Sequence, residues 1–170
     1  MINLVKLVDG EARIINDDPW SLIRDDAQQS VFEPSILPFE TWKSRQDEKV
    51  LRAEHTSPDG ILLLPDDQPE ILVPWLSVIP MIAIDFPSFR DGRAYSLAYI
   101  LRARLGWRGE LRAVGDVLRD QLSHMRHCGF DAFAVREDKS VEDALKGLAG
   151  ISVLYSRSVL EPNPLFRRRN

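Results

Sequence analysis

The sequence contains one cysteine, Cys128, among its 170 residues. A single cysteine forms no internal disulfide, and without several thiolates the chain offers no ligand set for an iron–sulfur centre. Long apolar runs are missing too, because the most apolar window, ILVPWLSVIPMIAI (71–84), is short and is broken by Pro74 and Pro80. The first residues show no basic segment followed by an apolar core, so we expect no secretory signal. We therefore expect a cytoplasmic protein that does not associate with a membrane.

Short motifs that would identify a particular type of reaction or cofactor are also absent from the sequence. It has no G-x-G-x-x-G dinucleotide loop, no P-loop, no C-x-x-C pair and no G-x-S-x-G elbow. The three histidines are scattered along the chain, which argues against a catalytic triad. A pI near 5.4 and arginines without interleaved aromatic residues argue against nucleic acid as a partner. The cofactor, if there is one, is unknown from the sequence.

Charge is divided unevenly along the chain. Residues 1–84 carry 7 Lys and Arg against 15 Asp and Glu, a net charge of −8, whereas residues 85–170 carry 15 against 11, a net charge of +4. An arginine-rich half suits an anionic ligand or an acidic partner. Two simpler explanations stay open, namely attraction between the two halves and ordinary solvated surfaces.

The length and pattern predict a single domain, 1–170, of the α/β class. Its parts are a hairpin with an irregular or helical remainder (1–58), an α/β core (59–160) and a basic tail (161–170). NLVKLV and EARII flank Asp9-Gly10, a dipeptide typical of a two-residue hairpin turn. We also expect a short helix within PWSLIRDD (19–26) and another helix from Pro38.

Five short apolar runs alternate with helical patterns, which predicts a mainly parallel sheet. The predicted strands are Ile61–Leu64, Met81–Asp85, Leu111–Gly115, Ala132–Val135 and Ile151–Tyr155. Apolar spacing predicts helices over 93–106, 116–129 and 140–150, with Asp116 and Ser140 as N-caps and Gly129 as a carboxyl-terminal stop. We expect an open sheet of about five strands with flanking helices, half-barrel-like or doubly wound, with the hairpin at an edge or outside.

Ligands of such sheets bind beyond the carboxyl ends of the strands, so the residues that follow the predicted strands are the candidates. The candidate anion-binding residues are Ser88, Arg90, Gly92, Arg93, Arg136 and Arg157. The candidate general acids or bases are Asp85, Asp91 and Asp116. Helix amino-termini at the same edge would add N–H donors, which suits a phosphate, sulfate or carboxylate group.

The stretch FPSFRDGRAYSLA (86–98) also has a purely structural interpretation. Ser88 and Asp91 have the spacing of a capping box, and Asp91 with Gly92 would serve equally as a cap and a turn. Capping needs no ligand, so the sequence leaves both interpretations open.

A second cluster consists of residue types that bind metals. Asp120, His124 and Cys128 recur every four residues, and His127 lies beside them. Three ligands from one helix seldom converge on one ion, because the stripe drifts around the helix over two turns. We therefore predict no metal site here and interpret Cys128 as a small core residue.

Three segments carry a family resemblance, namely FPSFRDGRAYSLA, LRARLGWRGELRAVGDVLRDQ and RHCGFDAF. Through them, residues 60–170 resemble an uncharacterised bacterial family, domain of unknown function 934. The resemblance implies an oxidoreductase role in sulfite reduction, inferred largely from gene neighbourhood with assimilatory sulfite reductase. It implies no particular catalytic residues.

On this basis we expect an accessory protein or oxidoreductase component of assimilatory sulfite reduction, a part of sulfur assimilation. It would bind sulfite reductase, its electron donor or a small oxyanion such as sulfite. The alternative is an α/β enzyme that acts on a small phosphorylated or sulfonated metabolite, with Arg90, Arg93 and Arg136 holding the anion. A structural subunit without a ligand is the third hypothesis, and the sequence does not decide whether the chain is an enzyme.

Overall fold

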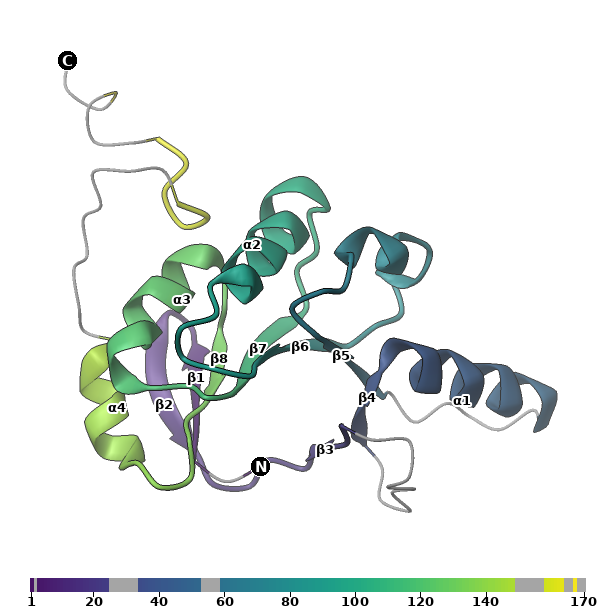
Figure 1. Cartoon of the computed structure of the whole chain (residues 1–170), viewed down its shortest axis with the longest axis horizontal. Coiled ribbons are helices and arrows are strands. Elements are labelled where there is room, and N and C mark those ends of the chain that lie inside the picture. The colour runs from purple at the N-terminus through teal and green to yellow at the C-terminus, as the bar shows by residue number, and fades with distance from the viewer. Residues whose placement is uncertain (2, 25–33, 53–58, 149–157, 164–166, 168–170) are drawn as a thin grey trace.

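The computed structural model describes residues 1, 3–24, 34–52, 59–148, 158–163 and 167, with only the backbone given for 48–52. Eight strands in these residues form one sheet (Figure 1). The strands are β1 (Leu4–Val8), β2 (Glu11–Ile15), β3 (Ser21–Leu22), β4 (Ser35–Pro38), β5 (Gly60–Leu63), β6 (Met81–Phe86), β7 (Glu110–Gly115) and β8 (Ala132–Ala134). The α-helices are α1 (Phe39–Arg52), α2 (Arg93–Tyr99), α3 (Leu122–Cys128) and α4 (Val141–Gly147), and the tighter or wider helical turns are η1 (Pro69–Trp75), η2 (Ile100–Arg104) and η3 (Arg119–Gln121).

The strands follow the order β2-β1-β8-β7-β6-β5-β4-β3 across the sheet. The strands from β3 to β8 all pair in parallel, and the β1–β2 hairpin adds antiparallel to β8 at one edge. The predicted α/β class, the mainly parallel sheet and the edge hairpin are therefore confirmed. The predicted number of about five strands is wrong, because the hairpin continues the same sheet and two further strands lie in residues 21–38. The predicted strand Ile151–Tyr155 lies outside the described residues.

A short connection forces this sheet to curl. Eight strands about 4.8 Å apart would span roughly 34 Å if the sheet were flat. The two edge strands, β2 and β3, are joined by residues 16–20 alone, and this connection reaches no further than about 20 Å. The edges must therefore approach each other, which gives a half-barrel with a convex and a concave face.

Asp18, in that connection, is held against the middle of the concave face by Arg112 of β7. The guanidinium of Arg112 donates to both oxygens of Asp18 over 2.8 and 2.9 Å and also donates to Glu110 over 2.6 Å. The amino-terminal NH3⁺ of Met1 lies 3.0 Å from the same Asp18 carboxylate. The side chains of Arg112 and Asp18 are only 1% and 4% exposed. This buried network fastens the connection between the two edges to a central strand.

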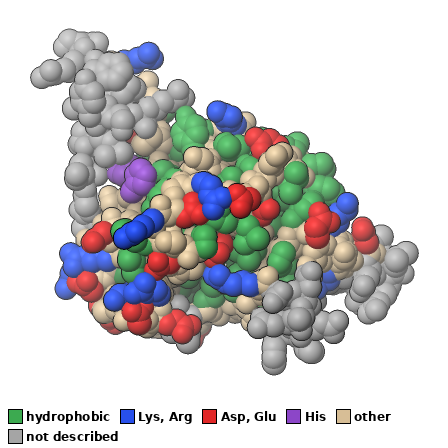
Figure 2. Space-filling model, in the orientation of Figure 1, with side chains coloured by type: hydrophobic (Ala, Val, Ile, Leu, Met, Phe, Trp, Pro, Cys, Tyr) green, Lys and Arg blue, Asp and Glu red, His purple; other side chains and the backbone are tan. Residues whose placement is uncertain are grey.

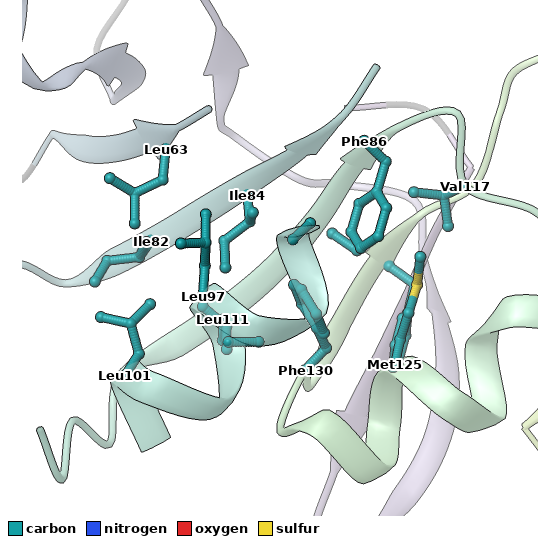
Figure 3. Packing of buried hydrophobic residues seen from close by; sticks show 14 of the residues in the cluster. Leu63, Ile82, Ile84, Phe86, Leu97, Leu101, Leu111, Val117, Met125 and Phe130 are labelled. Carbon is teal, nitrogen blue, oxygen red and sulfur yellow. The ribbon is translucent and has the colours of Figure 1, made fainter. Parts of the chain in front are cut away.

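The main hydrophobic core lies between the convex face and the helices (Figure 3). The strand residues labelled there are Leu63, Ile82, Ile84, Phe86 and Leu111, and they face Leu97, Leu101, Met125 and Phe130. Each α-helix contributes to this one cluster, with Trp42 from α1, Ala98 from α2, Met125 from α3 and Ala144 from α4. Since the described helices cover one face only, the sheet is half-barrel-like and not doubly wound. A smaller cluster, including Leu4, Ile36, Met81 and Val114, occupies the concave face.

The helix predictions divide into confirmed and wrong ones. The helices predicted from Pro38, over 93–106 and within 140–150 are confirmed, and Ser140 caps α4 by accepting the Asp143 N–H over 3.1 Å. Gly129 ends α3 as predicted, with a φ of 109°. The short helix predicted within 19–26 is wrong, because residues 21–22 form β3. The described α-helices are not long and apolar enough to cross a membrane.

Candidate functional site

An open cleft of about 820 Å³ lies where the β3 edge faces the carboxyl ends of β7 and β8. Its lining residues are Met1, Trp20, Ser21, Leu22, Arg24, Gly115, Ala134, Val135, Arg136, Glu137 and Asp138. The walls are therefore partly apolar, and two arginines reach them. A cleft of this volume accommodates an organic ligand several times larger than a bare oxyanion.

Asp85 lies beside this cleft, at the carboxyl end of β6. It is 6% exposed, and its Oδ1 lies 2.7 Å from Nη2 of Arg24, although the contact lacks hydrogen-bond geometry. Burial raises the pKa of the Asp85 carboxyl above its usual value, and the Arg24 cation offsets only part of that effect. A buried carboxylate with a raised pKa at this end of a parallel strand is a candidate acid–base group.

Gly115, the last residue of β7, lines the cleft directly against Asp85. Its φ of +96° is rarely adopted by other residues. A Cβ at this position would lie 2.8 Å from Asp85 Oδ1 and 2.5 Å from the carbonyl oxygen of Phe86. Only glycine therefore allows β7 to pass this close to the carboxylate.

Arg136 reaches the cleft from the end of β8, but it has two carboxylate partners. Its Nη1 donates to Asp116 over 2.7 Å, and its Nε and Nη2 donate to Asp138 over 2.6 and 3.0 Å. The hydrogen bonds from Arg136 hold the pKa of Asp138 down at about 2. An anion that binds Arg136 must share it with these two carboxylates.

Asp116 was predicted as a helix N-cap and as an acid or base, and the structure gives it another position. It does not cap α3, which begins six residues later at Leu122 after the turn η3. Its carboxylate accepts the Phe89 N–H over 2.8 Å and the Arg136 guanidinium over 2.7 Å. Asp116 thus ties the loop after β6 to the loop after β8, which leaves its oxygens occupied.

Asp91 and Arg93 form a local ion cluster outside the lining of the cleft. Asp91 accepts from the backbone N–H of Arg93 over 3.1 Å and from its Nη2 over 2.6 Å, and Arg93 also bonds to Asp66. These hydrogen bonds lower the pKa of Asp91 to about 2, so it stays ionised and poorly suited to carrying a proton at neutral pH. Through Arg93, this cluster links the start of α2 to the loop after β5.

The rest of FPSFRDGRAYSLA closes on itself as a turn. The Oγ of Ser88 accepts the Arg90 N–H over 3.3 Å, and the Ser88 carbonyl accepts the Asp91 N–H over 2.9 Å. Gly92 is the N-cap residue of α2 without a side-chain bond, so the predicted Ser88–Asp91 capping box does not form at the helix start. Arg90 is exposed, and Arg157 lies outside the described residues.

Two residues of α3 that are of a metal-binding type, His124 and Cys128, contact each other, and His124 also contacts a neighbouring aromatic ring. The His124 ring lies 4.6 Å from the Tyr95 ring, and its Nε2 lies 3.8 Å from Cys128 Sγ. Burial raises the pKa of Cys128 to about 11, which makes its thiol a poor nucleophile. Within the described part of the chain, no three His, Cys, Asp or Glu side chains are arranged to hold a metal ion.

Of the candidates chosen from the sequence, the structure therefore brings Asp85 and Arg136 to the region of the cleft. Arg24 and Trp20 were missed by sequence reasoning. They flank a two-residue strand that has no periodic signal, and Arg24 meets Asp85 only because the sheet curls. Elsewhere, acidic and basic side chains lie next to one another on the face in Figure 2. Ion pairs between the two halves have both senses, because Asp18–Arg112 and Asp66–Arg93 join a first-half acid to a second-half arginine, whereas Lys6–Glu110 and Arg24–Asp85 do the reverse. These pairs therefore do not account for the uneven charge.

A family described as a bacterial protein of unknown function (DUF934) matches residues 60–166. This segment runs from β5 through α4 and contains Asp85, Gly115 and Arg136 but not Arg24. No curated protein and no solved structure matches the chain.

Proposed function

We propose that the chain, which belongs to a bacterial family of unknown function (DUF934), is an α/β enzyme that acts on a small phosphorylated or sulfonated metabolite in the cleft. The observation that carries the proposal is the pair formed by Asp85 and Arg24. It places a buried carboxylate of raised pKa beside a cation that lines an open cleft.

The roles follow from the positions of the three charged groups. Arg24 and Arg136 attract the anionic group of the metabolite, and an arginine fork suits a phosphate or sulfonate. Asp85 acts as the general acid or base, because a raised pKa brings proton transfer closer to neutral pH. Trp20 and Leu22 provide apolar surface for the remainder of the molecule.

Binding is tested by titration calorimetry with phenyl phosphate and benzenesulfonate. We expect Arg24→Gln to weaken binding at least tenfold, because it removes a charge-assisted contact. Arg93→Gln is the matched control, since Arg93 is an exposed, carboxylate-bound arginine outside the cleft. If Arg24→Gln binds both probes as the wild type does, the cleft is not the anion site.

Turnover is tested with a mixture of metabolites, so the substrate need not be identified first. The purified protein is incubated with the small-molecule fraction of a bacterial extract, and mass spectrometry follows each metabolite. We expect the wild type to consume a phosphorylated or sulfonated compound that Asp85→Asn leaves intact. A wild-type profile identical to that of Asp85→Asn would contradict an enzymatic role for this site.

The second candidate is an accessory protein, or oxidoreductase component, of assimilatory sulfite reduction that binds the reductase or its electron donor. A specific feature favours a partner-binding role. Ile71, Val73 and Val78 are exposed in and just after η1, and Leu64 is exposed shortly before it. Figure 2 shows hydrophobic side chains gathered on the side of this face where η1 lies, teal in Figure 1. Clustered exposed apolar residues are typical of interaction surfaces.

Growth of a deletion strain separates the two candidates. Loss of the gene should prevent growth on sulfate but not on sulfide if the protein serves sulfite reduction. Complementation with the triple variant Ile71→Ser, Val73→Ser, Val78→Ser tests the surface, and complementation with Asp85→Asn tests the cleft. Normal growth of the deletion strain on sulfate would remove the link to sulfite reduction.

A further inference from the structure

The ion pair between Arg24 and Asp85 is unequal in its exposure. The Arg24 side chain is 46% exposed and lines the cleft, whereas the Asp85 side chain is 8% exposed and is carried by a strand inside the sheet. A ligand in the cleft therefore reaches the arginine. The guanidinium can turn toward the ligand, but the carboxylate is fixed by β6 and cannot follow it.

Among the residues that the structure describes, Asp85 has little else to replace Arg24. Opposite it β7 places Val114, then Gly115, while β5 ends at Leu63, beside Ile84. Arg24 is the charged side chain that acts on Asp85 within the described residues, and Oδ1 has no well-formed hydrogen bond there. The other charged groups that line the cleft are the terminal amine of Met1, Arg136, Glu137 and Asp138. The amine is engaged by Asp18, and Arg136 is engaged by Asp138 and Asp116.

We propose that an organic anion entering the cleft draws Arg24 away from Asp85, and that Asp85 takes up one proton from solvent in exchange. The inference rests on the proposed anion site, and it adds that binding of the anion is coupled to proton uptake by Asp85. A buried carboxylate that loses its counter-cation is costly to keep ionised, so protonation is the less costly state. No such exchange occurs at Arg136, because its partner Asp138 is 56% exposed and remains solvated without it.

The cleft also defines the class of anion. Its volume of about 820 Å³ exceeds what a bare sulfite or sulfate fills. Its apolar lining residues, Trp20, Leu22 and Val135, suit the organic part of a larger ligand. The ligand is an organic phosphate or sulfonate whose charged group meets Arg24 and whose body lies along these walls. In the bound state Asp85 carries a proton beside the ligand, which gives it the role of a general acid.

Proton uptake makes binding depend on pH with a fixed sign. Removal of Arg24 raises the pKa of Asp85 further above its value in the free protein. At a pH between the pKa of Asp85 in the free protein and its higher pKa in the complex, the complex holds up to one proton more than the free protein. The affinity for the ligand therefore falls as pH rises through this window. The decline reaches at most about tenfold per pH unit for a single linked proton.

Benzenesulfonate is the probe, because it stays a monoanion over the whole working range and exchanges no proton itself. Calorimetry in two buffers with different ionisation enthalpies counts the protons taken up on binding. We expect uptake approaching one proton in the wild type within that pH window, and binding without uptake in Asp85→Asn. Arg13→Gln, an exposed arginine of β2 paired with Glu11, is the control and should match the wild type.

The outcomes separate this inference from the proposed function. Benzenesulfonate binding that depends on Arg24 but is independent of pH overturns the proton exchange and leaves the anion site in place. No binding of any organic anion overturns both. If Asp85→Asn does not fold, carbon-13 NMR of the carboxyl groups in the wild type decides the matter. One buried carboxyl should shift to its protonated position on ligand addition, and unchanged signals would contradict the inference.

Discussion

Asp18→Asn tests whether the buried network on the concave face holds the curled sheet together. The substitution keeps the size of the side chain and removes the charge that Arg112 and the terminal amine share. Removing one partner of a buried ion pair costs about 3–5 kcal/mol, and we expect the lower end because Glu110 still neutralises Arg112. With a urea dependence of about 2 kcal/mol per molar for a domain of this size, the midpoint should fall by about 1.5 M.

The assay is urea unfolding followed by tryptophan fluorescence, with Asp17→Asn as the matched control. Asp17 is the exposed neighbour of Asp18, so its substitution should change the unfolding free energy by less than about 0.5 kcal/mol. Equal midpoints for Asp18→Asn and Asp17→Asn would refute the reasoning. The sheet would then be curled by its hydrophobic face and the short connection alone.

The same carboxylate predicts a pH dependence of stability. Burial alone raises the pKa of Asp18, but the hydrogen bonds and charges of Arg112 and the terminal amine outweigh it, so the folded-state pKa lies below the ordinary value of 3.8. A lowered pKa contributes stability above the unfolded-state value, and that stability is lost as pH falls through the folded-state value. We expect the wild type to lose this stability in acid below about pH 4, and Asp18→Asn to show a flatter profile.

Three further changes test local features of the structure. Gly115→Ala should lower the unfolding free energy by about 1–3 kcal/mol in thermal denaturation, because the new Cβ would meet the Phe86 carbonyl at a φ of +96°; Gly92→Ala, with open space around it, should differ little from the wild type. Ser140→Ala removes the cap of α4 and should lower the melting temperature by about 2–4 °C; an unchanged temperature would show that the cap carries no stability. Cys128 should react with a disulfide reagent at neutral pH at least about tenfold more slowly than a free thiol, since its pKa is about 11; rapid labelling of the folded protein would contradict this burial effect.

The hairpin and the central strands could be predicted because their signals are local. Asp9 and Gly10 adopt φ values of 53° and 83°, the left-handed conformation that the dipeptide predicts. The apolar runs of β5, β6 and β7 are buried, as continuous apolar stretches predict. The two strands β3 and β4 were missed because they are short and carry prolines or serines, so that neighbouring strands, not their own pattern, make them extended.

The residues of the candidate site likewise divide into those that local sequence identifies and those that only the fold brings together. Asp85 could be identified from the sequence because it ends an apolar run that predicts a buried strand, and the carboxyl end of such a strand lies at the ligand-binding edge of the sheet. Its partner Arg24 lies far away along the chain, in a segment without periodicity, and becomes adjacent only through the curl. Asp91 and Arg93 looked like a ligand site in the sequence, yet their side chains bind each other. Residue type cannot show whether a charge is already neutralised by its neighbours.

The sequence by itself determined the alternation of strands and helices, the edge hairpin and the caps at Ser140 and Gly129, since hydrophobic periodicity and turn chemistry act over a few residues. Only the tertiary structure decided that the sheet curls, because that depends on a five-residue connection between its two edges. The curl in turn buries Arg112 with Asp18 and brings Arg24 to Asp85. Coulomb interaction between groups distant in sequence depends on the distance that the fold sets, and the sequence pattern does not contain that distance.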